Sequence, residues 1–266
     1  PYILYKKPDI GWGLLEACVS SGPKALWNHA YECLYHSYTR EFERVDGYLQ
    51  RMKAEAMPEA GKTWGLLATL AFLSGHLAWK QVREALREMD VEEAWKGAMD
   101  VLITNIHNAK YYALCAQGID SILSERKLDI KIGGMLNRLF WDKDGRFTSF
   151  PLDFIRKCFV YKNTHPQDRT DFFHPLGKWL LWISNHDAEL GITVTEWMVH
   201  YAQDHKRWIL VEREIPHLLT RFFREAEDNE EVDGGALLKR VVALQDEFLV
   251  LGTDRIEEWL EAAERP

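Results

Sequence analysis

The chain has 266 residues, of which 47% are hydrophobic and 12% aromatic, and it carries a formal net charge of −8. This composition can bury a large core, so we expect a folded protein of one or two domains. No apolar run approaches the roughly 18 residues that cross a bilayer, and the first residues lack the order of a secretory signal, so no membrane association is expected. The cysteines lie far apart without Cys-x-x-Cys spacing, which favours reduced thiols and a cytoplasmic location.

The negative charge is concentrated in one part of the chain. Residues 225–266 hold 13 acidic and 4 basic side chains, so residues 1–224 carry a net charge of only +1. We predict a helical body over residues 1–230 and an acidic C-terminal helical hairpin over residues 231–266, packed on the body rather than forming a separate domain. An acidic hairpin of this kind suits a basic protein partner or mimicry of nucleic acid.

Apolar residues recur every three or four positions along most of the chain. This period predicts an all-α fold, a single multi-helix globular body with an acidic C-terminal helical segment. Two capping signatures, Asp90 with Glu93 and Thr193 with Glu196, are expected to mark helix starts. The expected helices cover residues 23 to 47 or 58, 63–86, 90–118, 120–141, 151–161, 175–190, 194–227 with a break at Pro216, 235–251 and 254–264.

Strand character is confined to Tyr2–Tyr5 and Phe147–Phe150. Most tryptophans fall within helical patterns, where a bulky aromatic ring usually fills the core, and we expect that role rather than a platform for stacking bases. The tryptophans concerned are Trp27, Trp64, Trp79, Trp95, Trp179, Trp182, Trp197 and Trp208.

One segment combines an arginine and a histidine at the start of an expected helix. It reads Arg169-Thr-Asp-Phe-Phe-His174 and follows a polar loop. At this spacing both side chains point the same way, so the arginine can hold a phosphate through two hydrogen bonds while the histidine moves a proton near neutral pH. Equally, Arg169 can pair with Asp168 or Asp171 as a helix-start ion pair. The basic side chains nearby that we expect to bind RNA are Arg156, Lys157 and Lys162.

The string DRTDFFHPLGKWLL, preceded by the helix IGGMLNRLF and a polar loop, resembles the signature of the HEPN superfamily, which are all-α proteins. The resemblance covers about residues 128–190, and Thr170 stands where the family more often has Asn, Asp or His. It implies an intracellular, metal-independent endoribonuclease of a toxin or defence system, with a composite site at a homodimer interface and no cofactor. Arg169 would stabilise the phosphorane, His174 would move the ribose hydroxyl proton and Thr170 would assist, leaving a cyclic phosphate.

Two metal sites are alternatives to the ribonuclease site. His186-Asp187 resembles the doublet of metal-dependent phosphohydrolases, although the usual surrounding sequence is not matched. Glu214-Ile-Pro-His217 has the Glu-x-x-His spacing of di-iron helices, yet no second copy is present. The sequence thus predicts no resident metal, and the candidates for completing the phosphohydrolase site are His165, His174, His200 and Asp204.

The motifs of serine hydrolases, phosphate-binding loops and dinucleotide-binding folds are absent from the sequence. Two classes of function therefore remain beside the phosphohydrolase. The first is a HEPN-like protein that binds or cleaves RNA. The second is a non-enzymatic helical scaffold, nucleoprotein or protein–protein adaptor, in which the acidic segment meets a partner. Both classes predict a protein partner or a homodimer.

Overall fold

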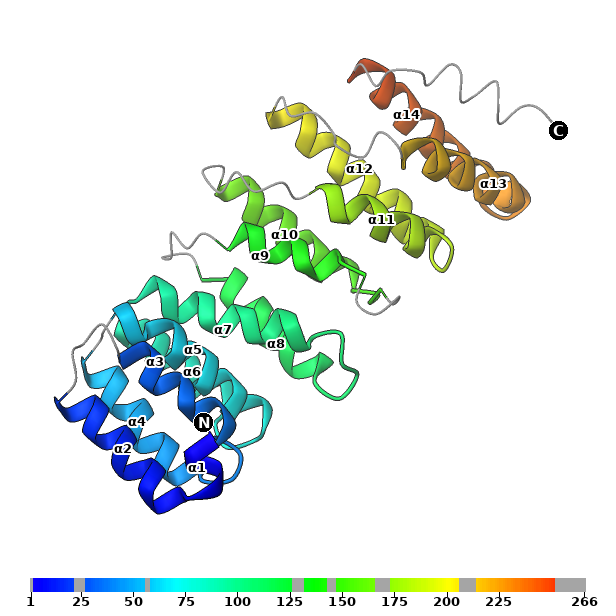
Figure 1. Ribbon diagram of the computed structural model, residues 1–266. Helices are drawn as coiled ribbons and strands as arrows, with labels where there is room; N and C mark the ends of the chain where they lie inside the picture. Colours follow the sequence, from blue (N-terminus) through cyan, green and yellow to red (C-terminus); the bar gives the residue numbers. More distant parts are fainter. Residues whose placement is uncertain are drawn as a thin grey trace. The chain divides into compact units, whose positions relative to one another are not determined.

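The computed structural model describes residues 2–21, 27–55, 58–125, 132–142, 147–165, 173–205 and 214–251, and every regular element in these ranges is helical (Figure 1). The predicted all-α class is confirmed. Among the described helices, none combines the length and the apolar character that crossing a membrane requires. Contacts between residues divide the chain into two compact units, Pro1–Met135 and Leu136–Pro266, called unit 1 and unit 2 below.

Unit 1 is built from helices of different lengths, from four residues in η2 to 16 in α5. Its helices are α1 (Tyr2–Lys6), α2 (Pro8–Ser21), α3 (Trp27–Glu32), the 3₁₀ helix η2 (Cys33–His36), α4 (Phe42–Glu55), α5 (Pro58–Leu73), α6 (Trp79–Met89), α7 (Glu92–Asn105) and α8 (Tyr112–Leu123), with α9 (Gly133–Leu136) at the boundary. Unit 2 holds the 3₁₀ helix η3 (Asn137–Phe140), α10 (Leu152–Thr164), α11 (Phe173–Ser184), α12 (Ala188–His205), α13 (Ile215–Asp233) and α14 (Ala236–Val250).

Helix α5 lies at the centre of unit 1 and contacts α3, α4, α6 and α7. Between Gly61 and Leu73 almost every position is buried, with Lys62 the exposed exception. A helix that is apolar on all sides must be surrounded by other helices to be stable. The indole N–H of Trp64 donates to the carbonyl oxygen of Leu49 (3.0 Å), which ties the central helix to α4.

The tightest interface in unit 1 joins α5 to α7. Two glycines allow it, because neither has a side chain to hold the backbones apart. A Cβ atom at Gly65 would overlap the carbonyl oxygen of Ala94, and one at Gly97 would overlap the carbonyl oxygen of Lys62. The two helices therefore approach with backbone against backbone, a geometry that larger residues at these positions would exclude.

Unit 2 is a succession of helical hairpins. Helices α11 and α12 form one hairpin and α13 and α14 the next, and α11 also packs on α13 while α12 packs on α14 (Figure 1). Gly234 and Gly235, both with positive φ, form the turn between α13 and α14. At the other end of the unit, Trp179 packs against Phe140 and Phe150, and its indole N–H donates to the carbonyl of Thr148 (2.8 Å).

Five helices that the sequence predicts as continuous are in fact interrupted. The helix expected over residues 120–141 stops after Leu123, and the helix expected over residues 175–190 breaks at residues 185–187 between α11 and α12. The helix expected from residue 23 breaks at residues 37–41, where the carbonyl of Ser37 accepts hydrogen bonds from the N–H groups of Arg40 and Glu41. The helix expected over residues 63–86 ends after Leu73, because Gly75 takes a left-handed conformation (φ 82°). The helix expected over residues 90–118 breaks at residues 106–111, where the Asn108 side chain accepts from the N–H of Lys110.

Both predicted capping signatures are wrong. Asp90 closes α6 in a left-handed conformation (φ 51°), and α7 begins after Val91. Thr193 lies inside α12 and donates to the carbonyl of Glu189, whereas the carboxylate of Asp187 accepts from the N–H of Leu190 and caps that helix. Asp and Thr also occur at helix ends and inside helices, where they bond to nearby backbone groups, so these residue types do not by themselves mark a helix start.

The two predicted strand segments are also wrong, since Tyr2–Lys6 is helical and Phe147–Phe150 is irregular. Other predictions agree with the structure, among them the helices over residues 151–161 and 235–251, which match α10 and α14 within a few residues. The expected core role is confirmed for Trp27, Trp64, Trp79, Trp95 and Trp179, while Trp182 and Trp197 are half-buried and Trp208 lies outside the described residues.

Of the predicted acidic hairpin, the structure describes residues 231–251. Residue 231 lies within α13, and the division into two units falls at residue 135. The separation of residues 1–230 from residues 231–266 stays a prediction. The helix expected over residues 254–264 lies outside the described residues.

Gly65→Ala is expected to lower the free energy of unfolding by about 2–4 kcal/mol, because the added methyl group overlaps backbone atoms that no rotamer change can move. Gly97→Ala should act in the same way from the other helix. Gly13→Ala is the matched control, since open space surrounds Gly13 and alanine favours a helix interior by about 0.5–1 kcal/mol. Denaturant unfolding followed by circular dichroism measures the three values, and equal stabilities would contradict the close approach of α5 and α7.

Candidate functional site

The residues predicted for RNA cleavage fall largely outside the described part of the chain. Arg169 and Thr170 lie in the undescribed range 166–172, and His174 belongs to the first turn of α11 with its side chain not described. The ribonuclease arrangement therefore stays a prediction. Of the predicted RNA-binding residues, all three belong to α10: Arg156 is exposed and 4.0 Å from Asp153, Lys157 is half-buried, and Lys162 has an undescribed side chain.

The histidines considered as metal ligands make local contacts. Nδ1 of His186 is 2.9 Å from the carbonyl oxygen of Trp182, and Nδ1 of His165 is 3.0 Å from that of Tyr161. Nε2 of His200 lies 3.7 Å from a carboxylate oxygen of Glu247. Among the residues that the structure describes, no three His, Cys, Asp or Glu side chains gather closely enough to hold a metal ion.

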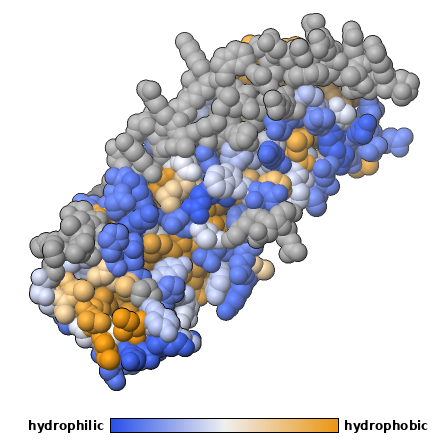
Figure 2. Space-filling view, viewed as in Figure 1, coloured by the Kyte–Doolittle hydropathy of each residue, from blue (hydrophilic) through white to orange (hydrophobic). Residues whose placement is uncertain are grey.

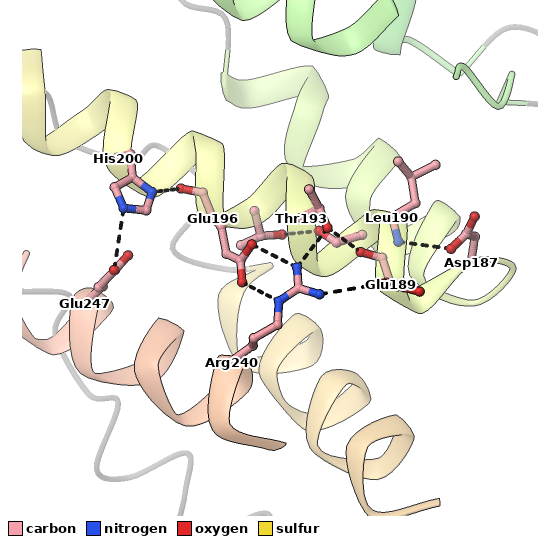
Figure 3. A network of polar contacts seen from close by, with 10 residues as sticks. Asp187, Glu189, Leu190, Thr193, Glu196, His200, Arg240 and Glu247 are labelled. Carbon is pink, nitrogen blue, oxygen red and sulfur yellow. Dashed lines mark hydrogen bonds and ion pairs between the residues drawn. The ribbon is translucent and has the colours of Figure 1, made fainter. Parts of the chain in front are cut away.

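A polar network joins α12 to α14 in unit 2 (Figure 3). Arg240 donates two hydrogen bonds of 2.9 Å to the two carboxylate oxygens of Glu196 and a third to the hydroxyl of Thr193 (2.8 Å). Another guanidinium nitrogen is 3.8 Å from Glu189. The hydrogen bonds with Glu196 raise the pKa of Arg240 above its ordinary value. Such a bidentate pair fixes the register between two helices.

A groove of about 360 Å³ lies beside Arg240. Its polar groups are used within the fold: Glu225 pairs with Arg221 and accepts from Asn229, and Asp233 accepts from the N–H groups of Gly235 and Leu237 at the start of α14. Since these groups already have partners, we assign the network a structural role.

A second pocket, of about 410 Å³, opens in unit 1. Within it the rings of Trp12 and Tyr48 stack with centroids 5.9 Å apart, and the guanidinium of Arg44 lies over the Trp12 ring at 5.5 Å. We call it the α2–α4 pocket after the helices that line it, and its lining residues are Trp12, Glu16, Glu43, Arg44, Gly47, Tyr48 and Arg51.

Glu16 organises one wall of this pocket. Its carboxylate accepts hydrogen bonds from Ser20, from the hydroxyl of Tyr48 (3.0 Å) and from Arg51 (3.1 Å). Hydrogen bonds from Ser20 and Tyr48 hold the pKa of Glu16 below its usual value. Burial, together with the bond to Glu16, raises the pKa of Tyr48 to about 12. A charged carboxylate and a neutral phenol therefore coexist here at neutral pH.

Sequence reasoning missed this pocket entirely. Residues 8–21 were not predicted as a helix, so nothing placed Trp12 and Glu16 on a common wall. A partial signal was present on the other side, where Arg44, Tyr48 and Arg51 follow one another at helical spacing and Gly47 interrupts the helix pattern. Comparison with protein-family models, with curated proteins and with solved structures finds no match for the chain.

Tyr31 contacts Tyr48 of the α2–α4 pocket, and its burial predicts how the stability of the protein depends on pH. It is fully buried, its ring meets that of Tyr48 edge-on, and within the described residues its hydroxyl has no hydrogen-bond partner. Burial raises the pKa of Tyr31 to about 12, whereas an unfolded tyrosine titrates near pH 10, about two units lower. The folded protein therefore keeps Tyr31 neutral up to a higher pH than the unfolded chain does. The contribution of the neutral, buried Tyr31 to stability is complete below about pH 10 and is lost as the pH rises to about 12.

Tyr31→Phe should therefore raise the unfolding free energy at neutral pH by about 1 kcal/mol, because it removes an unpaired buried hydroxyl. Between about pH 10 and 12 the variant should lose stability less steeply than the parent chain, by up to about 1.4 kcal/mol per pH unit. Denaturant unfolding across this pH range measures both effects. Tyr48→Phe serves as comparison, since losing its bond to Glu16 should destabilise the chain at neutral pH. Identical alkaline profiles for Tyr31→Phe and the parent would refute the assignment.

Proposed function

We propose that the chain is a helical scaffold or adaptor that binds a protein partner through an exposed apolar surface on α1 and α2. This α1–α2 apolar surface consists of five large side chains between 46% and 73% exposed: Tyr2, Ile3, Tyr5, Ile10 and Leu14. Hydrophobic surface gathers at the part of unit 1 where α1 and α2 lie (Figure 2). Clustered apolar exposure is a mark of interaction sites, whereas single exposed apolar residues are common on any protein.

The surface is held in a fixed shape by the packing beneath it. Leu4, which alternates with the exposed residues of α1, is buried, and α1 packs directly on α2. A Cβ atom at Gly11 would lie 2.7 Å from the backbone N and Cα of Leu4, so the two helices are in backbone contact. A preformed surface loses little conformational entropy when a partner binds.

Basic groups lie beside Tyr5 at one side of the apolar surface and favour an acidic partner. The guanidinium of Arg40 lies 4.8 Å from the centre of the Tyr5 ring, and the ammonium of Lys6 lies 5.0 Å from it. Lys7 is exposed beside them. The surface therefore suits a protein with an apolar centre and an acidic rim, because opposite charges at a rim favour encounter and register.

Unit 2 adds a second surface that favours an adaptor role. The last two turns of α13 carry four exposed carboxylates, Glu227, Asp228, Glu230 and Glu231, without a basic residue in the last turn. Negative charge at a helix C-terminus opposes the helix dipole, and like charges three or four positions apart repel each other. A basic partner would relieve both effects.

The double variant Ile10→Glu with Leu14→Glu is expected to lower affinity for the partner at least about tenfold, because it places charges in the centre of the apolar surface. The fold should be unaffected, since both side chains are more than half exposed. Val242→Glu with Val250→Glu is the matched control, with the same two added charges at exposed positions of α14. The measurement is affinity capture, followed by calorimetry with the purified captured protein.

The proposal fails if the double variant and its control bind that protein equally. The same two variants also test two other possible ligands of the α1–α2 apolar surface. Loss of self-association in the double variant, seen by size-exclusion chromatography, would assign the surface to a second copy of the chain. Loss of binding to anionic phospholipid vesicles would assign it to a lipid surface.

A second candidate is the HEPN-like ribonuclease. It is supported by the segment Arg169–His174, which leads into the first turn of α11, and by the exposed Arg156 on the preceding helix. In this function Arg169 holds the scissile phosphate, His174 transfers the proton and Thr170 assists, with RNA bound along the basic residues of α10.

For this candidate, Arg169→Ala and His174→Ala should each abolish RNA cleavage in the presence of chelator, while helix content and melting temperature stay close to those of the parent. Cleavage of mixed RNA followed by end-group analysis for the cyclic phosphate is the measurement. His186→Ala is the control and should cleave normally. Cleavage that requires added metal and is lost in His186→Ala would instead support the phosphohydrolase, and no cleavage by the parent chain would exclude the ribonuclease.

A further inference from the structure

We infer that the α2–α4 pocket is a binding site for a single cationic side chain, the ammonium of a lysine or the guanidinium of an arginine in a partner segment. The volume of about 410 Å³ lies near the lower end of the range for ligand sites, about 300–1,000 Å³. It accommodates one long side chain and its adjoining backbone. This site is separate from the α1–α2 apolar surface, because Trp12 and Glu16 lie two positions along α2 from Ile10 and Leu14 and so face the opposite side of the helix.

Gly47 contributes to the open space in this pocket. It lies in the interior of α4, where glycine is less favourable than alanine by about 0.5–1 kcal/mol. At Gly65 and Gly97 the same disadvantage is offset by close helix packing, but a Cβ at Gly47 would meet no atom within 4 Å. Its φ is not among the positive values of the chain, so no turn requires it either. What the missing side chain does provide is room in the pocket that Gly47 lines.

The charges in and around the pocket select a cation. Three of the lining charges are already paired: Glu16 with Arg51 at 3.1 Å, and Arg44 with Glu41 at 3.3 Å. Glu43 is exposed, and within the described residues it forms neither a hydrogen bond nor an ion pair. It is therefore the uncompensated charge of the lining.

The neighbouring charges reinforce this preference. Arg51 also pairs with Glu55 at 3.3 Å, outside the lining itself. Two arginines thus face four glutamates in this cluster, which leaves it with net negative charge at neutral pH: Arg44 and Arg51 against Glu16, Glu41, Glu43 and Glu55.

The aromatic wall adds affinity for a cation that hydrates weakly or has a planar face. Arg44 already makes a contact of this kind: its guanidinium lies over the indole of Trp12 and is ion-paired with Glu41. The half-buried ring of Tyr48 offers a second aromatic surface beside Gly47. Its phenol donates to Glu16 and stays neutral, so the wall adds no charge of its own.

The test uses the full chain and three small probes: acetyl-arginine methylamide, acetyl-lysine methylamide and the uncharged acetyl-citrulline methylamide. Heteronuclear NMR follows the indole N–H of Trp12, whose signal is assigned by its absence in Trp12→Phe. We expect saturable shifts with the arginine and lysine probes and none with citrulline. Glu43→Gln should weaken binding about fivefold, through loss of one partly exposed ion pair, and Gly47→Leu should abolish it by filling the pocket.

Gly13→Leu is the matched control, because Gly13 is also an exposed helical glycine with open space around it but does not line the pocket. It should bind as the parent does, and so should the Ile10→Glu, Leu14→Glu variant within about twofold, which separates this site from the apolar surface. Circular dichroism confirms that each variant is folded. The inference is overturned if neither cationic probe gives a saturable shift at about 50 mM, if citrulline binds equally well, or if Gly47→Leu binds like Gly13→Leu.

Discussion

The close approach of α5 and α7 is the constraint on which unit 1 depends. Because Gly65 and Gly97 have no side chains, the two backbones meet directly, and α5 is held where α3, α4 and α6 can surround it. The position of α4 follows, since Trp64 on the central helix donates to the carbonyl of Leu49. A displacement of α5 would therefore also affect α4, the helix that carries Gly47 and one wall of the pocket.

Paired and unpaired charges have different roles in this protein. Arg240, with Glu196 and Thr193, forms a network whose members all have partners, and it fixes α14 on α12. Glu43 has no such compensation among the described residues, nor have the four carboxylates Glu227, Asp228, Glu230 and Glu231 of α13. An ion pair within the fold contributes to helix register. A charge without an internal partner can instead attract an oppositely charged group on another protein.

The scaffold and ribonuclease proposals differ in what they require of the structure. An adaptor needs a preformed surface, and the backbone contact between Gly11 and Leu4 provides one on α1 and α2. A metal-independent nuclease needs an arginine and a histidine that contact the same phosphodiester, and in this chain those residues would be Arg169 and His174. The hairpin succession of unit 2 is compatible with either function, because folds of helical hairpins carry binding surfaces and catalytic sites alike.

The sequence by itself determined the helical class, because a period of three to four apolar residues is a local property that tertiary contacts rarely override. It also determined the core role of tryptophans such as Trp95 and Trp179. Only the tertiary structure decided where long helices break, as at Gly75, because a glycine within a helical pattern can either continue the helix or take the left-handed conformation that ends it, and packing selects between the two. It alone decided the pocket, since Trp12 and Tyr48 are distant in sequence and meet only when α2 and α4 pack in unit 1. Pairings between distant residues leave no periodic signal in a single sequence, and so the fold class was predictable while the site was not.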